Sequence, residues 1–345
     1  MLSDGIQNIY IINMDKDVDR LQRVTQECKK INPFLIPKRV PGVDMSKGYP
    51  ENLKAYYSPL TPVISKSAIG CGLAHISAWE TLVRNGDSSA LILEDDAEVV
   101  DNFQESFDKI SKTVPKDYDI IYLGCYIGCD INKEYGYEYS VTKLAVKANK
   151  VIKINDNVFV PAIPLALHGY ILSNKGARYL LSCFERNKLY SHVDLQLMGY
   201  LSNCKVYAVD PKLINQRKIN VFESNNTSAK YPRTLNTLFS LGHTEGFPVA
   251  YNLSIANFEI FGIPLNMYTL ITLVLGIVIG RSVSLTFKNY KLVSAWYLIF
   301  VISEFLMLPD NEKFKGKVVT TLVKNEVFTY LVLLLGVYIG NWTRG

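Results

Sequence analysis

The chain has 345 residues, of which 48% are hydrophobic and 20% are charged, and its formal net charge is +5. Its length fits about two structural units of ordinary size. The mild positive charge is not gathered in a basic tract, so the sequence does not indicate a nucleic-acid partner. It suits an anionic small substrate or an anionic membrane surface.

The six cysteines are scattered along the chain, and only Cys125 and Cys129 are near neighbours. No second pair accompanies them, so the spacing does not favour a zinc site. Residues 1–17 lack the basic flank, apolar core and cleavage site of a secretory signal. We therefore expect reduced thiols and a cytoplasmic placement of the N-terminal domain.

The first part of the chain predicts strands and helices in alternation. A strand is expected at 6–14, a charged helix at 17–30 and a second strand at 34–40, which Pro41 and Gly42 end. Residues 67–84 are expected to be helical because their apolar side chains recur near one face.

The pattern continues beyond this helix. The predicted elements are a buried strand at 90–93, a helix at 103–110, a strand at 119–123, a strand at 170–172, a helix at 175–184 and a strand at 206–209. Such alternation is typical of an α/β domain whose mostly parallel sheet is covered on both faces. Residues 126–157 are polar and are expected to form an excursion over the sheet.

The composition changes near residue 250, and three long apolar segments follow, at 260–280, 292–308 and 327–343. The first has 21 uncharged residues, enough to cross a bilayer core of about 30 Å. The two shorter segments also fit hairpins or interfacial helices. We expect a domain at 1–250 and, at 251–345, a membrane-embedded region with up to three apolar helices.

Two features favour the packing of these helices against one another. Gly276 and Gly280, like Gly336 and Gly340, place small residues on one helical face and permit close backbone approach. Glu304 lies within an apolar segment and should face a partner or a polar cavity.

Three carboxylates, Glu94, Asp95 and Asp96, directly follow the strand predicted at 90–93. Ligands of open α/β sheets bind outside the carboxyl ends of the strands. Adjacent acids there repel one another unless a cation or a donor network compensates. Two alternatives remain open from the residues alone: a Mg²⁺ or Mn²⁺ site that bridges to a diphosphate, or an acidic turn or helix N-terminus.

The first strand ends near Asn13, and Arg20 lies in the helix that follows. A loop of this kind can hold a nucleobase or ribose while the arginine contacts phosphate. A helix cap with a surface ion pair is the alternative. No glycine-rich phosphate motif follows the strand, which argues against dinucleotide folds and phosphate-loop ATPases.

His75 and Trp79 are four residues apart and share one side of the helix predicted at 67–84. Each alone also fits the core. Asp194 precedes a helix, so it is either a cap or a base that activates an acceptor hydroxyl.

Taken together, these sequence segments resemble the motifs of glycosyltransferase family 25, the group of lipopolysaccharide-biosynthesis and procollagen galactosyltransferase enzymes. The segments occur in the order and spacing of the family over about residues 5–230. They are residues 9–13 with Asp19 and Arg20, residues 40–44, residues 68–75 with Trp79, residues 90–96, residues 169–173 with Gly176 and Ala177, and residues 193–194.

This resemblance implies a GT-A, Rossmann-like fold and an inverting, metal-dependent transfer of a hexose. The implied donor is a UDP-linked nucleotide sugar, and the implied acceptor is a hydroxyl on a glycan, lipid or protein. Mn²⁺ or Mg²⁺ is the implied cofactor.

The resemblance also implies roles for particular residues. Asp95 and Asp96 would hold the metal, and Asp194 would be the catalytic base. The residues that would line the nucleotide sugar are Asn13, Arg20, Val40, Gly42, Asp44, His75, Glu94 and Asp95.

Two other functional hypotheses compete with that of a glycosyltransferase. A membrane scaffold that keeps a transferase-like domain without catalysis would bind a nucleotide sugar or glycan and not turn it over. A nucleotidyltransferase would require a glycine-rich basic loop after the first strand, and the segment from Asn13 to Arg20 contains no glycine.

Overall fold

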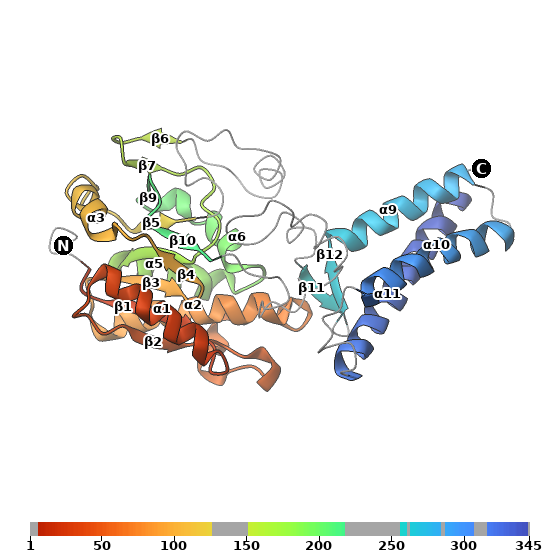
Figure 1. The fold of residues 1–345 in the computed structure, drawn as a ribbon, viewed down its shortest axis with the longest axis horizontal. Helices are drawn as coiled ribbons and strands as arrows, with labels where there is room; N and C mark the ends of the chain where they lie inside the picture. Colours follow the sequence, from red (N-terminus) through yellow and green to blue (C-terminus); the bar gives the residue numbers. More distant parts are fainter. Residues whose placement is uncertain are drawn as a thin grey trace. The chain divides into compact units, whose positions relative to one another are not determined.

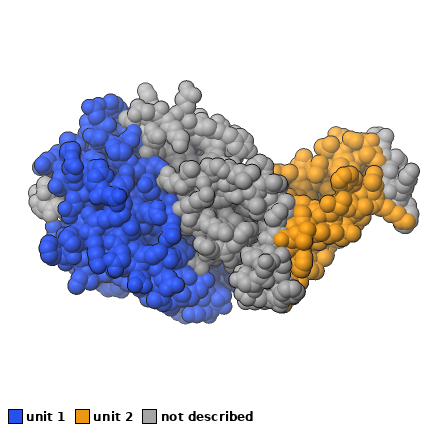
Figure 2. All heavy atoms as spheres, viewed as in Figure 1, with its two compact units in different colours: residues 1–219, 244–246 blue, residues 220–243, 247–345 orange. Residues whose placement is uncertain are grey.

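The computed structural model describes residues 6–125, 151–217, 256–260, 263–283, 287–306 and 316–343. The chain divides into two compact units, which Figure 2 colours separately. The N-terminal unit holds residues 1–219 with 244–246, and the C-terminal unit holds residues 220–243 with 247–345. The expected boundary near residue 250 lies outside the described residues.

The N-terminal unit is built on an eight-stranded sheet (Figure 1). Its strands, in spatial order, are β2 (Lys38–Pro41), β1 (Ile9–Asn13), β3 (Ser89–Glu94), β8 (Gly169–Ser173), β5 (Ile120–Gly124), β9 (Val206–Val209), β7 (Val158–Val160) and β6 (Ile152–Lys153). Strand β1 is parallel to β2 and β3, and β5 is parallel to β9.

The sheet is mixed, so the expectation of a mostly parallel sheet needs correction. Strand β8 is antiparallel to both β3 and β5, and β7 is antiparallel to β9 and β6. A parallel neighbour requires a crossover connection, usually a helix. The described part of the connection between β5 and β8 contains the short β6–β7 pair. Most of the excursion predicted at 126–157 lies outside the described residues.

Helices cover both faces of this sheet, as expected. On one face Ile92 and Tyr170 belong to a buried cluster with side chains of α2 (Lys66–Asn85), α5 (Asn174–Asn187) and α6 (Val193–Met198). On the other face Leu91 and Leu93 are buried with side chains of α1 (Val18–Ile31) and α3 (Phe103–Ser111). Successive β3 residues thus point to opposite faces, and both faces are apolar.

The predicted helices agree with the structure to within a few residues, but the second strand does not. Strand β2 begins only at Lys38, and the side chains of Phe34 and Ile36 are 93% and 84% exposed. Pro33 and Pro37 lack the backbone donors that a strand needs, so the predicted strand at 34–40 is wrong over its first half. Short 3₁₀ helices lie at Met45–Lys47, Glu51–Tyr56, Thr61–Val63 and Leu201–Asn203.

A small second sheet extends the acidic end of β3. Strand β4 (Ala97–Val99) begins directly after Asp96 and pairs antiparallel with β10 (Ile214–Gln216). Gln216 pairs with Ala97 in this register. A residue from the end of the N-terminal unit therefore lies next to Asp96.

One cysteine differs from expectation. Cys125, directly after β5, is disulfide-bonded, whereas Cys28, Cys71, Cys183 and Cys204 are free. The expectation of reduced thiols is therefore wrong for Cys125. Because disulfides persist mainly in oxidising compartments, this bond removes the support that the cysteines gave to a cytoplasmic placement.

The C-terminal unit begins, in its described part, with a hairpin of β11 (Ala256–Ile260) and β12 (Ile263–Asn266). Helix α9 (Met267–Ser282) follows, because Asn266 caps it and accepts a hydrogen bond from the Thr269 backbone N–H at 2.9 Å. Its 16 residues span about 24 Å, which is shorter than a bilayer core of about 30 Å. The membrane span predicted at 260–280 is therefore wrong in its first third.

Two longer helices follow in the described part of this unit, α10 (Phe287–Leu306) and α11 (Gly316–Trp342). Among the described residues, one helical segment, Leu322–Trp342, is long and apolar enough to cross a membrane. Up to three apolar helices were expected in this region; among the described residues, one of the three helices seen there is a candidate span by its length and composition. Glu304 of α10 is fully buried, as expected for a carboxylate in an apolar helix.

The packing expected from the glycine pairs is confirmed. A Cβ on Gly276 would lie 2.4 Å from the carbonyl oxygen of Leu333 and 3.0 Å from the Cα of Gly336. A Cβ on Gly280 would lie 2.1 Å from the carbonyl oxygen of Val337. The two helices therefore run parallel with their backbones in contact along this face, and only glycine permits that approach.

Gly280→Leu is expected to separate α9 from α11, because the added side chain would overlap the backbone at Val337. Hydrogen exchange of the full-length chain should show faster exchange of amides in both helices. Gly316→Leu is the matched control, since a Cβ there meets no atom within 4 Å. Unchanged exchange in Gly280→Leu would contradict this packing.

Candidate functional site

Two parallel strands bring the candidate residues together. Strands β1 and β3 end at the same edge of the sheet, where Ile12 pairs with Glu94. Asn13 follows on β1, and Asp95 and Asp96 follow on the turn after β3. Polar side chains at neighbouring carboxyl ends meet in this way in open α/β sheets.

Asp95 is held by two donors. Its Oδ2 accepts a hydrogen bond from Asn13 Nδ2 at 2.8 Å, and its Oδ1 forms an ion pair with Arg20 of α1. Burial raises the pKa of Asp95 to about 6, although the charge of Arg20 and the Asn13 hydrogen bond act in the opposite direction. Arg20 therefore compensates this carboxylate only in part.

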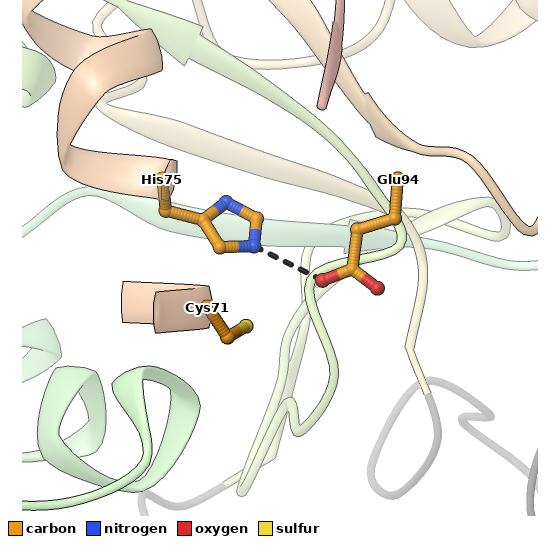
Figure 3. A group of neighbouring side chains, drawn as sticks. All are labelled: Cys71, His75 and Glu94. Carbon is orange, nitrogen blue, oxygen red and sulfur yellow. Dashed lines mark hydrogen bonds and ion pairs between the residues drawn. The ribbon is translucent and has the colours of Figure 1, made fainter. Parts of the chain in front are cut away.

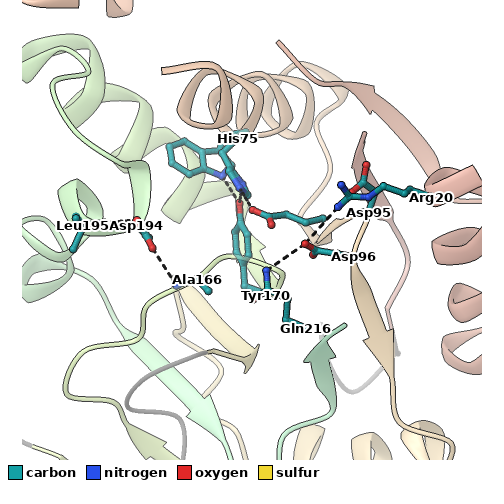
Figure 4. A network of polar contacts seen from close by, with 11 residues as sticks. Arg20, His75, Asp95, Asp96, Ala166, Tyr170, Asp194, Leu195 and Gln216 are labelled. Carbon is teal, nitrogen blue, oxygen red and sulfur yellow. Dashed lines mark hydrogen bonds and ion pairs between the residues drawn. The ribbon is translucent and has the colours of Figure 1, made fainter. Parts of the chain in front are cut away.

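Asp96 is less well compensated. Its Oδ2 accepts a hydrogen bond from Gln216 Nε2 at 3.2 Å and lies 3.5 Å from Arg20 Nη2, as Figure 4 shows. Its Oδ1 is buried and has no hydrogen-bond partner among the described residues. Burial, and next the charge of Glu94, raise the pKa of Asp96 to about 8. A buried carboxylate in this state requires a proton or a cation.

Glu94 turns toward α2 and ends a chain of buried hydrogen bonds. Trp79 Nε1 donates to the Tyr170 hydroxyl at 2.8 Å, and this hydroxyl lies 2.9 Å from His75 Nδ1. His75 Nε2 lies 3.0 Å from Glu94 Oε1. An indole N–H can only donate, so the Tyr170 hydrogen is available to Nδ1, and we assign the imidazole hydrogen to Nε2, facing Glu94.

This series of hydrogen bonds keeps Glu94 ionised. Burial by itself would raise the pKa of Glu94, but the hydrogen bond that His75 donates, together with the nearby charge of Arg20, outweighs burial and holds the pKa below its usual range. Neighbouring acids thus differ: Glu94 is held ionised, whereas Asp96 retains its proton more readily. Such a separation is characteristic of functional sites.

A thiol lies beside the same imidazole. Cys71 precedes His75 by one helical turn on α2, and Figure 3 shows both side chains directed toward Glu94. One ligand atom from each of the three residues lies within 4.8 Å of the other two. The side chain of His75 is fully buried, that of Glu94 is 26% exposed, and Cys71 is exposed.

Four of the residues expected to line a nucleotide have different surroundings: Asn13 and Gly42 lie in one loop at the site, whereas Val40 and Asp44 have structural roles. Asn13 and Gly42 lie together, since the Gly42 N–H donates to the Asn13 carbonyl at 2.8 Å and a Cβ on Gly42 would lie 2.6 Å from Met14 Sδ. Val40 is buried in the core, and Asp44 caps a 3₁₀ helix by accepting from the Ser46 N–H at 3.0 Å.

Three residues at this edge were not singled out from the sequence. Arg39 donates from Nε to Asn13 Oδ1 at 3.1 Å, because parallel pairing places it beside Ile11. Gln216 and Tyr170 come from distant segments. Nothing local in the sequence identifies Gln216, whereas Tyr170 lies in a strand that the pattern does predict.

Asp194 lies apart from this network. It follows the first residue of α6, and its Oδ1 accepts from the Leu195 N–H at 2.8 Å. Its Oδ2 accepts from the N–H of Ala166 at 3.3 Å, and Ala166 has a φ of 66°. The carboxylate therefore also supports a loop in the left-handed conformation, which a non-glycine residue rarely adopts. Figure 4 shows no hydrogen bond between Asp194 and the acidic residues.

Arg20→Ala is expected to destabilise the N-terminal unit by about 3 kcal/mol at pH 8, because two buried carboxylates lose their cationic partner. The cost should be smaller at pH 5, where both carboxylates take up protons, given pKa values of about 6 and about 8. Urea unfolding at both pH values tests this. Arg23→Ala, on the exposed side of the same helix, should change little, and an equal loss in the two variants would contradict the ion pair.

Comparison with known proteins identifies one family. The sequence profile described as glycosyltransferase family 25 (LPS biosynthesis protein) matches residues 6–197. This range contains β1, β3, α2 and β8, and hence most of the residues described above.

Individual relatives match at low identity. "Inactive glycosyltransferase 25 family member 3" of Homo sapiens is 35% identical over 136 residues, which are 35% of this chain and 22% of that protein. "Putative glycosyltransferase" of Haemophilus influenzae is 26% identical over 214 residues, 61% of this chain and 69% of that protein.

"Procollagen galactosyltransferase 2" of Mus musculus is 25% identical over 132 residues, 35% of this chain and 21% of that protein. The chain thus spans about a fifth of the length of the human and mouse relatives.

Proposed function

The chain belongs to glycosyltransferase family 25, and from this membership we propose that it transfers a hexose from a UDP-linked nucleotide sugar to an acceptor hydroxyl. The proposed reaction inverts the anomeric centre and depends on a divalent cation. The observation that carries the proposal is Asp96, a buried carboxylate beside Arg20 whose Oδ1 has no partner among the described residues.

The acidic pair fits a hard divalent cation. Asp95 and Asp96 present carboxylate oxygens at a strand end, and Mn²⁺ or Mg²⁺ prefers oxygen ligands. Charge supports this fit, because a cation would compensate Asp96, whose pKa burial raises to about 8. When bound, the cation would supply Lewis-acid stabilisation to the departing diphosphate.

Residues of β1 and α1 are proposed to bind the nucleotide. Arg20 carries a planar cation suited to phosphate, and it reaches the site from the first turn of α1. Asn13 and Gly42 shape the loop next to it. In this arrangement Val40 and Asp44 support the loop from the core and from a helix cap.

Asp194 is proposed as the base that accepts the proton of the acceptor hydroxyl. Each of its oxygens now accepts one backbone hydrogen bond, and a carboxylate has further lone pairs to offer. The proton leaves the hydroxyl as its oxygen attacks the anomeric carbon, and the nucleoside diphosphate departs from the opposite side.

A membrane anchor is proposed for α11. Its Val327, Leu331 and Leu335 are 53%, 57% and 52% exposed, while Glu326 and Thr329 are each 2% exposed. One apolar stripe of α11 is thus exposed beside a buried carboxylate, although Leu333 and Val337 of the same helix are buried; such a stripe is unusual for a helix in water. The membrane would then carry the enzyme to a glycan, lipid-linked or protein acceptor.

An inactive scaffold is the second candidate. The relative from Homo sapiens is named inactive, and Arg20, the proposed phosphate ligand, is engaged by Asp95 in this structure. Such a protein would bind a nucleotide sugar without transferring it.

Full-length protein with a panel of UDP-sugars distinguishes the two candidates. For a transferase, we expect Mn²⁺-dependent release of UDP by the wild type, little release by Asp96→Ala and normal release by Asp108→Ala, a change of an exposed acid. A rise in melting temperature with UDP-sugar but no release would identify the scaffold. Equal release by wild type and Asp96→Ala would refute the metal site.

A further inference from the structure

We propose that Cys71, His75 and Glu94 form a binding site for a zinc-class cation, distinct in its ligands from the oxygen-only pair Asp95 and Asp96. The proposal goes beyond the transferase function and does not depend on it. The three ligand atoms, a thiol sulfur, an imidazole nitrogen and a carboxylate oxygen, lie within 4.8 Å of one another (Figure 3).

The spacing is close to what a tetrahedral ion requires. Zinc binds nitrogen and oxygen at about 2.0–2.2 Å and sulfur at about 2.3 Å. Tetrahedral angles then place nitrogen and oxygen about 3.3 Å apart, and sulfur about 3.6 Å from either. His75 Nε2 and Glu94 Oε1 are already 3.0 Å apart. The longest separation, which is at most 4.8 Å, must therefore shorten by at most about 1.2 Å to complete the site.

The backbone explains this arrangement. Cys71 and His75 are four residues apart on α2, so both side chains project from one face of a rigid helix. Glu94 approaches from the end of β3. Two ligands on a helix and one on a central strand are positioned by elements that are themselves packed in the core.

The surroundings of His75 resemble those of metal-binding histidines. Its second nitrogen, Nδ1, lies 2.9 Å from the buried hydroxyl of Tyr170, and a polar partner at that position orients the ring of a ligating histidine. Binding would release the thiol proton of Cys71 and move the imidazole hydrogen from Nε2 to Nδ1. The Tyr170 hydroxyl, which donates to Nδ1 in the metal-free protein, would then rotate so that its oxygen accepts this hydrogen.

The ligand set determines which ion binds. A thiolate with an imidazole favours zinc, whereas oxygen ligands alone favour Mg²⁺ or Mn²⁺. Three protein ligands leave a fourth position open, and the exposure of Cys71 gives solvent access to it. An ion here would engage Glu94, so zinc and the proposed nucleotide cation would influence each other through neighbouring acids.

The test is metal binding by the full-length chain, with Zn²⁺ in competition with a chromophoric chelator and Co²⁺ as a spectroscopic probe. We expect a thiolate-to-Co²⁺ charge-transfer band in the wild type. Cys71→Ser should lose this band and weaken Zn²⁺ binding by about tenfold or more. Cys204→Ser, a change of another free cysteine, should retain both.

A second measurement needs no variant. Bound Zn²⁺ should protect Cys71 of the wild type from alkylation, read by peptide mass spectrometry, and should leave the alkylation of Cys204 unchanged. Unaltered Zn²⁺ affinity in Cys71→Ser, a Co²⁺ spectrum without a thiolate band, or equal losses in both cysteine variants would overturn the proposal. None of these results depends on sugar transfer, so the transferase function stands or falls separately.

Discussion

Replacing Asp96 by asparagine is expected to abolish metal-dependent transfer and, at the same time, to stabilise the metal-free protein. Transfer should fall by on the order of 10²–10³, because a neutral amide binds a divalent cation poorly. The free energy of unfolding at pH 8 should rise by about 1–3 kcal/mol, because a buried carboxylate is replaced by a neutral group of similar shape. The hydrogen bond from Gln216 can be retained.

The pH dependence has a definite sign. Burial raises the pKa of Asp96 in the folded protein from 3.8 to about 8, so between these values the folded state holds a proton that the unfolded state has lost. The contribution to stability is complete below about pH 4 and is lost as the pH rises toward about 8. The wild type should therefore lose stability relative to Asp96→Asn across this window.

Urea unfolding of both proteins in the presence of a chelator, from pH 5 to pH 8.5, measures this difference. Asp108→Asn, a change of an exposed acid, serves as the control and should follow the wild type. A variant that is less stable than the wild type at every pH would show that Asp96 is a structural residue whose charge is already compensated.

Tyr170→Phe is the second large effect that we expect. The substitution removes the hydroxyl that links Trp79 to His75, and it leaves the indole N–H without its acceptor. We expect a loss of about 1–3 kcal/mol in the free energy of unfolding. Transfer should slow by about 10–100-fold, because His75 no longer orients Glu94.

Tyr122→Phe is a closely matched control. The ring of Tyr122 lies 6.3 Å from that of Tyr170 and is equally buried, but its hydroxyl has no hydrogen-bond partner among the described residues. Removing this hydroxyl should leave stability unchanged or slightly higher. If both variants lose the same stability and activity, the chain from Trp79 to Glu94 does not position the carboxylate.

The secondary structure of the N-terminal unit could be predicted because it depends on local patterns. Strand β9 lies at the predicted residues 206–209, and α2 differs from its prediction by one residue at each end. The antiparallel entry of β8 could not be predicted in this way. It depends on how the chain returns between β3 and β5, and alternating apolar residues do not encode strand direction.

The C-terminal segments show the limit of hydropathy. The uncharged run at 260–280 predicts one membrane span, but the hairpin of β11 and β12 takes up its first residues and Asn266 starts a helix too short to cross. The glycine pairs predicted the packing of α9 against α11 correctly, because residues without side chains allow two helix backbones to come into contact.

The candidate site was predictable where it lies on one strand end. Glu94, Asp95 and Asp96 stand out because charged residues directly follow a buried strand. The sequence alone could not distinguish their environments, because the side chains around them come from distant segments. Gln216 donates to Asp96, and Tyr170 contacts His75, which contacts Glu94. For the same reason the separation of their pKa values becomes visible only in the folded chain.

The ion pair between Arg20 and Asp95 gives the proposed transferase an internal counter-ion. A phosphate can take the guanidinium only if something else neutralises Asp95, and a cation can take Asp95 most readily once the guanidinium has moved away. Each ligand therefore removes the competitor of the other. By thermodynamic linkage, the cation must raise the affinity for the nucleotide by the same factor by which the nucleotide raises the affinity for the cation.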